Sequence, residues 1–135
     1  MTREEILKLE AGPELDRLVA EKVIGWEEGK DFDCSGEGTL IHYPFRNRVL
    51  SKKWSPSTDI AAAWEVVRRV FELKPTLGFV LFTDISGHCR AAFYDILEYI
   101  DQVVPVSEID DAETVPLAIC RAALLAVEAT QEKER

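Results

Sequence analysis

The sequence lacks a long hydrophobic run, since no apolar stretch approaches the roughly 18 to 20 residues that a helix needs to span a bilayer. The first residues, Met1 to Glu5, have an acidic and helical pattern and not the basic and apolar pattern of a signal peptide. These two absences exclude membrane-spanning and secreted proteins from the expected classes. We therefore expect a protein that stays in the cytoplasm where it is made and has no membrane partner.

Cysteine and histidine are also scarce, with three cysteines and two histidines in 135 residues. Cys34, Cys89 and Cys120 are odd in number, and their spacing matches neither a disulfide framework nor a zinc site. His88 and Cys89 are adjacent on an expected strand, so their side chains should point to opposite faces and not share a metal ion. We expect reduced thiols, no metal site, no cofactor and no catalytic residues.

Positive charge is in deficit, because 16 Lys and Arg oppose 25 Asp and Glu and leave a net charge of −9. Clustered basic side chains supply most of the attraction for a phosphate backbone, so binding along a long nucleic acid is not expected. The length of 135 residues, with 47% hydrophobic and 30% charged residues, fits one globular core. We therefore predict a single domain over residues 1–135.

One segment reverses this acidic balance. Within residues 27–56, which have the composition of a polar and basic loop region, residues 46–53 carry four positive charges in eight positions. These charges belong to Arg46, Arg48, Lys52 and Lys53. Residues 39–43, which precede the basic segment and are closed by Pro44, predict a short strand.

Helix signals are clear near the N-terminus. Thr2 and Glu5 form a capping box that starts a helix at about Arg3. Pro13 and Gly25 bound a second helix with apolar residues at helical spacing. We therefore expect two helices here, each with one face on the core.

The middle and the end of the chain predict two further helices. The central one should run from about Asp59 to Leu73, before Pro75. Its expected core face consists of Ile60, Trp64, Val67 and Phe71. The last helix has Thr114 as cap and Pro116 in its first turn. Its expected core face consists of Leu117, Cys120, Leu124 and Val127.

Residues 77–83 and 88–94 predict a β-hairpin around Ser86-Gly87, because both runs are apolar and the residues between them favour a turn. Val103 to Val106 is interpreted as a further strand. The predicted fold class is therefore α/β of the α+β type. It has a small, mainly antiparallel sheet covered by the N-terminal, central and C-terminal helices, in a sandwich-like arrangement.

The start of the central helix is a candidate binding site. Trp54, Ser57 and Thr58 lie where the N–H groups and dipole of a first turn favour an anion, and an indole face can stack on a base. The basic side chains that lead into it are Arg46, Arg48 and Lys53. The alternative is that Ser57 or Thr58 only caps the helix, Trp54 fills the core and the basic side chains are solvated.

Arg121 is the other candidate ligand-binding residue. It lies between apolar neighbours on the last helix, and together with Arg68 and Arg69 it would converge on a phosphate or carboxylate. The alternative is a surface ion pair with a glutamate such as Glu65 or Glu128.

Three blocks of sequence carry a resemblance to a known family. They run from MTREEI to LVAEKVIGW in residues 1–26, with STDIAAAWEVV in residues 57–67 and PLAICRAALL in residues 116–125. In their order and spacing these blocks resemble the phage ABA sandwich domain family. The resemblance implies an α/β/α sandwich and a bacteriophage origin, and it brings no assigned reaction. Residues 32–53 look longer and more basic than the family pattern.

These observations lead us to expect a small, non-catalytic binding protein of phage type. The leading hypothesis is that it binds and sequesters an anionic, nucleotide-like host immune signal that a homo-oligomer encloses. The alternative is a protein-interaction module, in which the basic segment and exposed aromatics dock onto a host or phage protein. A small nucleotide hydrolase comes third, because the sequence supplies no recognisable set of base, nucleophile and metal ligands.

Overall fold

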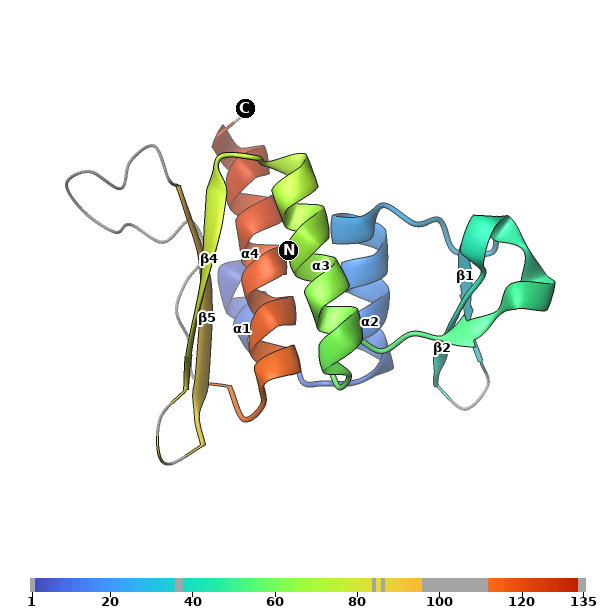
Figure 1. Cartoon of the computed structure of the whole chain (residues 1–135), viewed down its shortest axis with the longest axis horizontal. Coiled ribbons are helices and arrows are strands. Elements are labelled where there is room, and N and C mark those ends of the chain that lie inside the picture. The colour runs from blue at the N-terminus through green and yellow to red at the C-terminus, as the bar shows by residue number, and fades with distance from the viewer. Residues whose placement is uncertain (1, 36–37, 84, 86, 96–111, 134–135) are drawn as a thin grey trace.

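The computed structural model describes residues 2–35, 38–83, 85, 87–95 and 112–133. Over these residues the α+β class is confirmed, and the strands divide into two separate antiparallel sheets instead of one (Figure 1). The helices are α1 (Arg3–Leu7), α2 (Pro13–Val19), which continues as the π-helical turn η1 (Ala20–Ile24), α3 (Ile60–Leu73) and α4 (Val115–Lys133). The strands are β1 (Phe32–Cys34), β2 (Leu40–His42), β3 (Lys52–Lys53), β4 (Leu77–Thr83) and β5 (Cys89–Asp95). The short 3-10 turns η2 (Pro44–Arg46) and η3 (Arg48–Leu50) join β2 to β3.

The helix boundaries near the N-terminus follow the local signals. The Thr2 Oγ1 atom accepts from the Glu5 N–H at 3.2 Å, and the Thr2 N–H donates to Glu5 Oε2 at 3.1 Å, which completes the capping box. Pro13 begins α2. Gly25 ends η1 with a φ of 85°, a left-handed conformation that glycine adopts without steric cost. The two predicted N-terminal helices are therefore confirmed.

The predicted core face of α3 is wrong for most of its members. Ile60, Trp64 and Phe71 are 42%, 44% and 36% exposed. The buried side of the helix consists of Ala62, Ala63, Val66, Val67 and Val70. These small and β-branched side chains let α3 lie close to α4. The larger side chains lie along the flank of α3, where the Trp64 ring meets the Phe79 ring of β4 edge-on, with 5.8 Å between the ring centroids. The predicted face and the buried side of α3 both carry apolar residues at helical spacing, so the spacing alone does not show which side faces the core.

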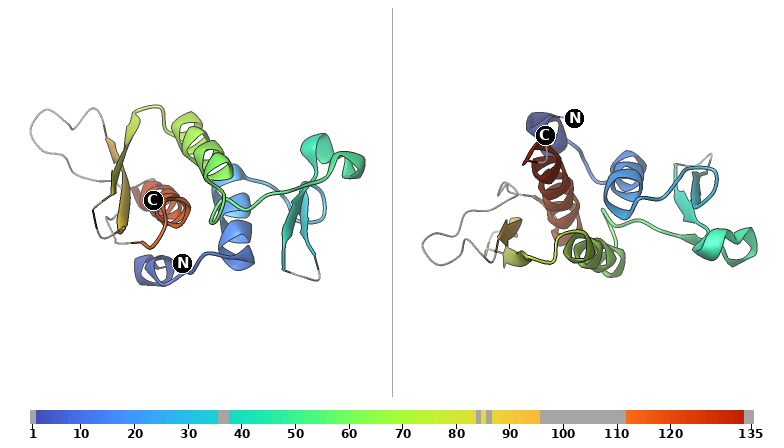
Figure 2. Two further views of the ribbon diagram at one scale, coloured as in Figure 1. Left: turned by 60° about the horizontal axis from the view of Figure 1, so that its bottom comes forward. Right: turned by 90° about the horizontal axis from the view of Figure 1, so that it is seen from above.

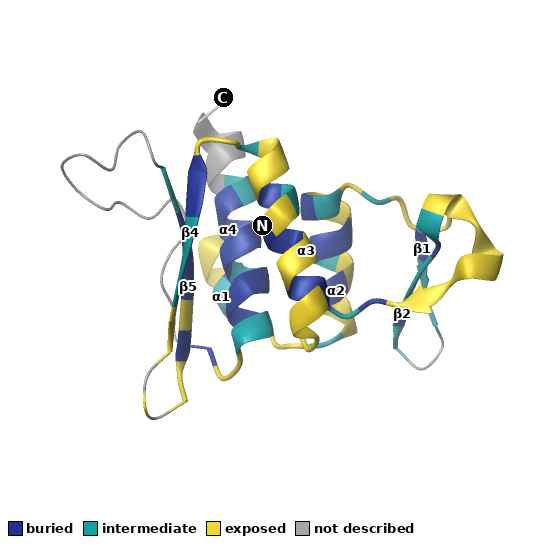
Figure 3. Cartoon of the chain, in the orientation of Figure 1, coloured by how far each residue is buried: buried dark blue, intermediate teal, exposed yellow. Residues whose placement is uncertain are grey.

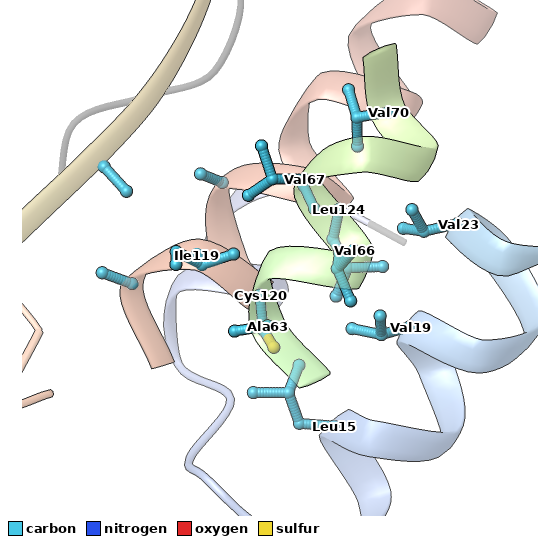
Figure 4. Close-up of a cluster of buried hydrophobic side chains, with 14 of the residues drawn as sticks. Leu15, Val19, Val23, Ala63, Val66, Val67, Val70, Ile119, Cys120 and Leu124 are labelled. Carbon is cyan, nitrogen blue, oxygen red and sulfur yellow. The ribbon is translucent and has the colours of Figure 1, made fainter. Parts of the chain in front are cut away.

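The last helix, α4, lies inside the molecule and does not cover it from outside. Leu117, Cys120 and Leu124 of its predicted face are buried, and so are most of the alanines on its other sides. It contacts α1, α2, η1 and α3, and also β5 of the hairpin. Side chains from α2, η1, α3 and α4 meet in one cluster (Figure 4). The alanine content of α4 follows from this position, because a helix packed on several sides needs short side chains.

The predicted hairpin is confirmed as β4 and β5, which pair antiparallel with Phe79 opposite Phe93. Among the described residues, helices lie on one side of this hairpin, between it and the second sheet, whereas the resemblance implied helices on both sides (Figure 1). The predicted strand from Val103 to Val106 lies outside the described residues. Within the described parts of the chain, no helix combines the length and apolar character needed to cross a membrane.

The second sheet forms a small lobe beside the helices (Figure 2). Its strand order is β1-β2-β3, with Phe32 opposite His42 and His42 opposite Lys52. The predicted strand at residues 39–43 is β2. The region 27–56, interpreted as a polar and basic loop, thus contains three short strands, and we call residues 27–54 the lobe.

Candidate functional site

The residues predicted to bind a ligand fall into three separate places. Arg46 and Arg48 lie in η2 and η3 of the lobe. Ser57 and Thr58 lie between the lobe and α3, whereas Arg121 lies on α4. Among these residues, only Arg121 lines the pocket at the start of α4, and the lobe lies away from α4 (Figure 1).

Ser57 is fully buried and joins the starts of two helices. Its Oγ accepts from the Gly12 N–H at 3.0 Å, and its own N–H donates to Oδ1 of buried Asp16 at 2.9 Å. Burial raises the pKa of the Asp16 carboxyl, and the hydrogen bonds from Ser57 act in the opposite direction. The cap of α3 is Asp59, which accepts from the Ala61 N–H at 3.2 Å, while the exposed Thr58 hydroxyl donates to the Ser55 carbonyl at 3.4 Å.

Trp54 lies in an aromatic joint between the lobe and the helices, formed by Trp26, His42, Trp54 and Glu65. The Trp54 ring is only 3% exposed, and its Nε1 donates to Glu65 Oε2 at 3.2 Å. Its centroid is 4.6 Å from that of Trp26, which stacks on His42 at 3.8 Å. Both indoles are therefore engaged within the protein, and this joint fixes the lobe on the helical body.

His42 sits in this joint with its Nδ1 atom buried and without a hydrogen-bond partner among the described residues. Burial lowers the pKa of the imidazole, and the charge of Lys52 on the neighbouring strand lowers it further. The carboxylates of Glu65 and Asp31 act in the opposite direction. The neutral ring is therefore favoured where it stacks on Trp26.

Arg121 is half-buried and ties α4 to the end of α1. Its Nε and Nη2 atoms donate to the Leu9 carbonyl at 3.0 and 2.8 Å. It also borders a pocket of about 440 Å³, which we call the α4 pocket. This pocket is lined by Glu10, Ala11, Ala112, Glu113, Thr114, Leu117 and Arg121. Two carboxylates at its edge make it a poor match for an anionic ligand.

The two arginines of the lobe are paired with carboxylates of β1 and the turn before it. Arg46 Nε lies 3.1 Å from Asp31 Oδ1, and Arg48 Nη1 lies 3.3 Å from Asp33 Oδ2. The Arg48 guanidinium also lies 4.8 Å from the centre of the Tyr43 ring, and the Tyr43 hydroxyl donates to Asp33 at 2.9 Å. These contacts use most of the charge that the basic segment brings to η2 and η3.

Lys52 and Lys53 behave differently from the arginines. Both side chains are exposed on β3, and neither has an ion pair within the described ranges. The unpaired positive charge of the lobe is therefore on this edge strand and not at the arginines.

The feature that sequence reasoning missed is an apolar tip on the lobe, formed by residues 44–50. Phe45, Val49 and Leu50 are 97%, 90% and 53% exposed. Figure 3 shows this end of the lobe mainly in yellow, the colour of exposed residues. Phe45 and Arg46 have φ angles of 55° and 60°, which are uncommon for residues other than glycine. The Asn47 side chain accepts from the Val49 N–H at 2.9 Å and shapes the second turn. The sequence signal was present, because these apolar residues lie in a polar region without the spacing of a helix or strand.

In the described part of the chain, no group of three or more His, Cys, Asp and Glu side chains is placed to hold a metal ion. The three cysteines are free thiols, of which Cys89 and Cys120 are buried. Burial raises the pKa of the Cys120 thiol well above its ordinary value, which disfavours the thiolate form.

The family model of the phage ABA sandwich domain matches residues 17–124. The crystal structure of a phage protein from Bacillus cereus ATCC 14579 is similar, with a TM-score of 0.54 and 21% identity. The match covers 88% of this chain and 94% of that protein, and at this identity it concerns the fold alone. No curated protein matches the chain.

Proposed function

The chain belongs to the phage ABA sandwich domain family, and from this premise we propose that it is a non-catalytic docking protein whose lobe tip binds another protein. One observation carries the proposal, namely the exposure of Phe45, Val49 and Leu50 on one short segment. Single apolar residues are common on protein surfaces, but three exposed on two adjacent turns of one short segment are typical of an interaction site. The proposal assigns the chain no reaction.

Contacts within the lobe favour one shape of the tip. A left-handed conformation costs a residue other than glycine about 1 to 2 kcal/mol, and Phe45 and Arg46 both adopt it. The ion pairs of Arg46 with Asp31 and of Arg48 with Asp33 fasten the same turns to the sheet. A surface ordered in advance loses less conformational entropy on binding, so this arrangement favours recognition by the tip.

The hypothesis of an anionic, nucleotide-like ligand has less support and stays a prediction. Trp54 and Ser57 are buried and bonded within the protein, and Arg121 donates to a backbone carbonyl. A thermal-shift screen with cyclic nucleotides and ADP-ribose derivatives tests it directly. We expect no shift at millimolar concentration, whereas a saturable shift that Arg121→Ala removes would favour the nucleotide hypothesis over docking by the tip.

Site-specific photo-crosslinking tests the docking proposal. A benzophenone analogue of phenylalanine is placed at Phe45 in phage-infected cells, and at Phe82 of β4, which is 54% exposed, as the matched control. We expect position 45 to form discrete crosslinks to protein that position 82 does not form. The crosslinks should be lost when Val49→Ser and Leu50→Ser are added. Equal labelling from both positions, or none from position 45, would overturn the proposal.

A further inference from the structure

We propose that the partner of the lobe tip is a second copy of the chain, which receives Phe45 in its α4 pocket. This inference rests on the proposed function because it uses the same tip, and it adds the identity of the bound surface. Both surfaces belong to the described residues, and the charges beside them are opposite in sign.

The α4 pocket can accept an apolar side chain. Ala11, Ala112 and Leu117 form the apolar part of its lining, whereas Glu10, Glu113, Thr114 and Arg121 form the polar part. Its volume of about 440 Å³ lies within the range of about 300 to 1,000 Å³ that is usual for small ligand pockets. Phe45, with 97% of its surface exposed, is the most prominent apolar group of the lobe. Insertion of this ring would remove apolar surface from water on both copies.

The charges around the two surfaces are opposite. Glu10 and Glu113 are exposed at the pocket, and neither has an ion pair within the described parts of the chain. Lys52 and Lys53 are exposed beside the tip. Two copies of a protein with a net charge of −9 repel each other in general, so a favourable contact needs a basic segment facing an acidic one. The lobe supplies that segment.

The tip of a copy cannot reach its own pocket. The tip lies at the end of the lobe, whereas the pocket lies at the start of α4 and the link between α1 and α2, with α2 and α3 between them (Figures 1 and 2). The contact therefore joins different surfaces of two copies, head to tail. Because one turn enters one pocket, the interface is small, and we expect weak association with a Kd on the order of 100 µM.

Sedimentation velocity between about 10 µM and 1 mM tests the inference on the intact chain. We expect the mean mass to rise with concentration, and less so at 0.5 M salt than at low salt, because salt screens the lysine and glutamate pairs. Phe45→Ser should weaken association at least tenfold, and so should Glu10→Lys with Glu113→Lys. Phe82→Ser should leave it unchanged. Circular dichroism melting of each variant shows that the loss is not caused by unfolding.

A mixing experiment separates this arrangement from other forms of self-association. The Phe45→Ser variant keeps an intact pocket, and the Glu10→Lys, Glu113→Lys variant keeps an intact tip. Each alone should associate at least tenfold more weakly than the wild type, while an equimolar mixture should form dimers through the one complementary pair, at concentrations where neither variant alone does. A monomeric wild type at 1 mM, or a mixture that stays monomeric while the wild type associates, would overturn the inference.

The crosslinking experiment distinguishes the failure of this inference from that of the proposed function. Crosslinks from position 45 to residues 10–11 or 112–121 of another copy support both the docking function of the tip and self-docking into the α4 pocket. Crosslinks from position 45 to other proteins alone would overturn self-docking and leave the docking function standing. The absence of specific crosslinks from position 45 would overturn the docking function itself.

Discussion

The helical body and the lobe are stabilised in different ways. In the body, fully buried side chains such as Leu15, Val66 and Leu124 meet in one apolar cluster (Figure 4). In the lobe, η2 and η3 are shaped by local hydrogen bonds and by exposed or half-exposed ion pairs, and their apolar side chains face solvent. Apolar burial supplies most of the stability of a domain, whereas exposed ion pairs contribute little. The stability of this chain therefore comes mainly from the body, and the surface that we propose for docking lies in the lobe.

The largest effect should come from the body. Leu124→Ala removes a fully buried side chain from α4 and should lower the free energy of unfolding by about 3 kcal/mol, through lost burial and the cavity that remains. Leu50→Ala, in the tip, should change it by less than about 0.5 kcal/mol. Urea unfolding of both variants measures the difference. Similar losses in the two would contradict the division between body and lobe.

A smaller effect should come from the aromatic joint. Trp54→Phe removes the hydrogen bond to Glu65 and part of a buried ring, and should cost about 1.5 kcal/mol. Trp64→Phe is the matched control, because Trp64 is 44% exposed on α3, and it should cost less than about 0.5 kcal/mol. Hydrogen exchange should also become faster in β1 and β2 of the Trp54→Phe variant. Unchanged exchange there would show that the joint does not hold the lobe.

The pH dependence of stability should be smaller still and should arise partly at the joint. The pKa of His42 lies below its usual value of 6.5, so the folded protein favours the neutral ring. The neutral His42 ring contributes to the free energy of unfolding. This contribution is complete above pH 6.5 and is lost as the pH falls from 6.5 through the lower pKa of the folded state. NMR titration of the His42 ring measures its pKa in the folded protein. The pH dependence of the free energy of unfolding, compared between the wild type and His42→Phe, measures its contribution to stability. A His42 pKa at or above 6.5 would contradict the expected direction.

The local parts of the fold could be predicted from the sequence. The start of α1, the boundaries set by Pro13 and Gly25, and the hairpin all depend on residues close together in the chain. The buried side of α3 could not be predicted, because the helix has two stripes with apolar residues and the sequence does not show which one meets α4.

The candidate site was harder to predict than the local parts of the fold, because its contacts join residues that lie far apart in the sequence. Ser57 was a reasonable cap by its position, but its partners are Gly12 and Asp16, 45 and 41 residues away. Arg46 and Arg48 were correctly singled out as a charge feature, but their pairing with carboxylates 15 residues earlier follows from how β1 and β2 come together. Sequence patterns carry little information on such pairs, so the tip emerged only from the exposure of its side chains.

The most direct test measures two properties of one variant, Val49→Ser with Leu50→Ser. Both residues are exposed in the tip, so we expect the free energy of unfolding to stay within about 0.5 kcal/mol of the wild-type value. In the same variant, crosslinking from position 45 should fall to the level of position 82. A loss of more than about 2 kcal/mol, as for a buried site, or crosslinking that persists unchanged would contradict the assignment of the tip as a docking surface.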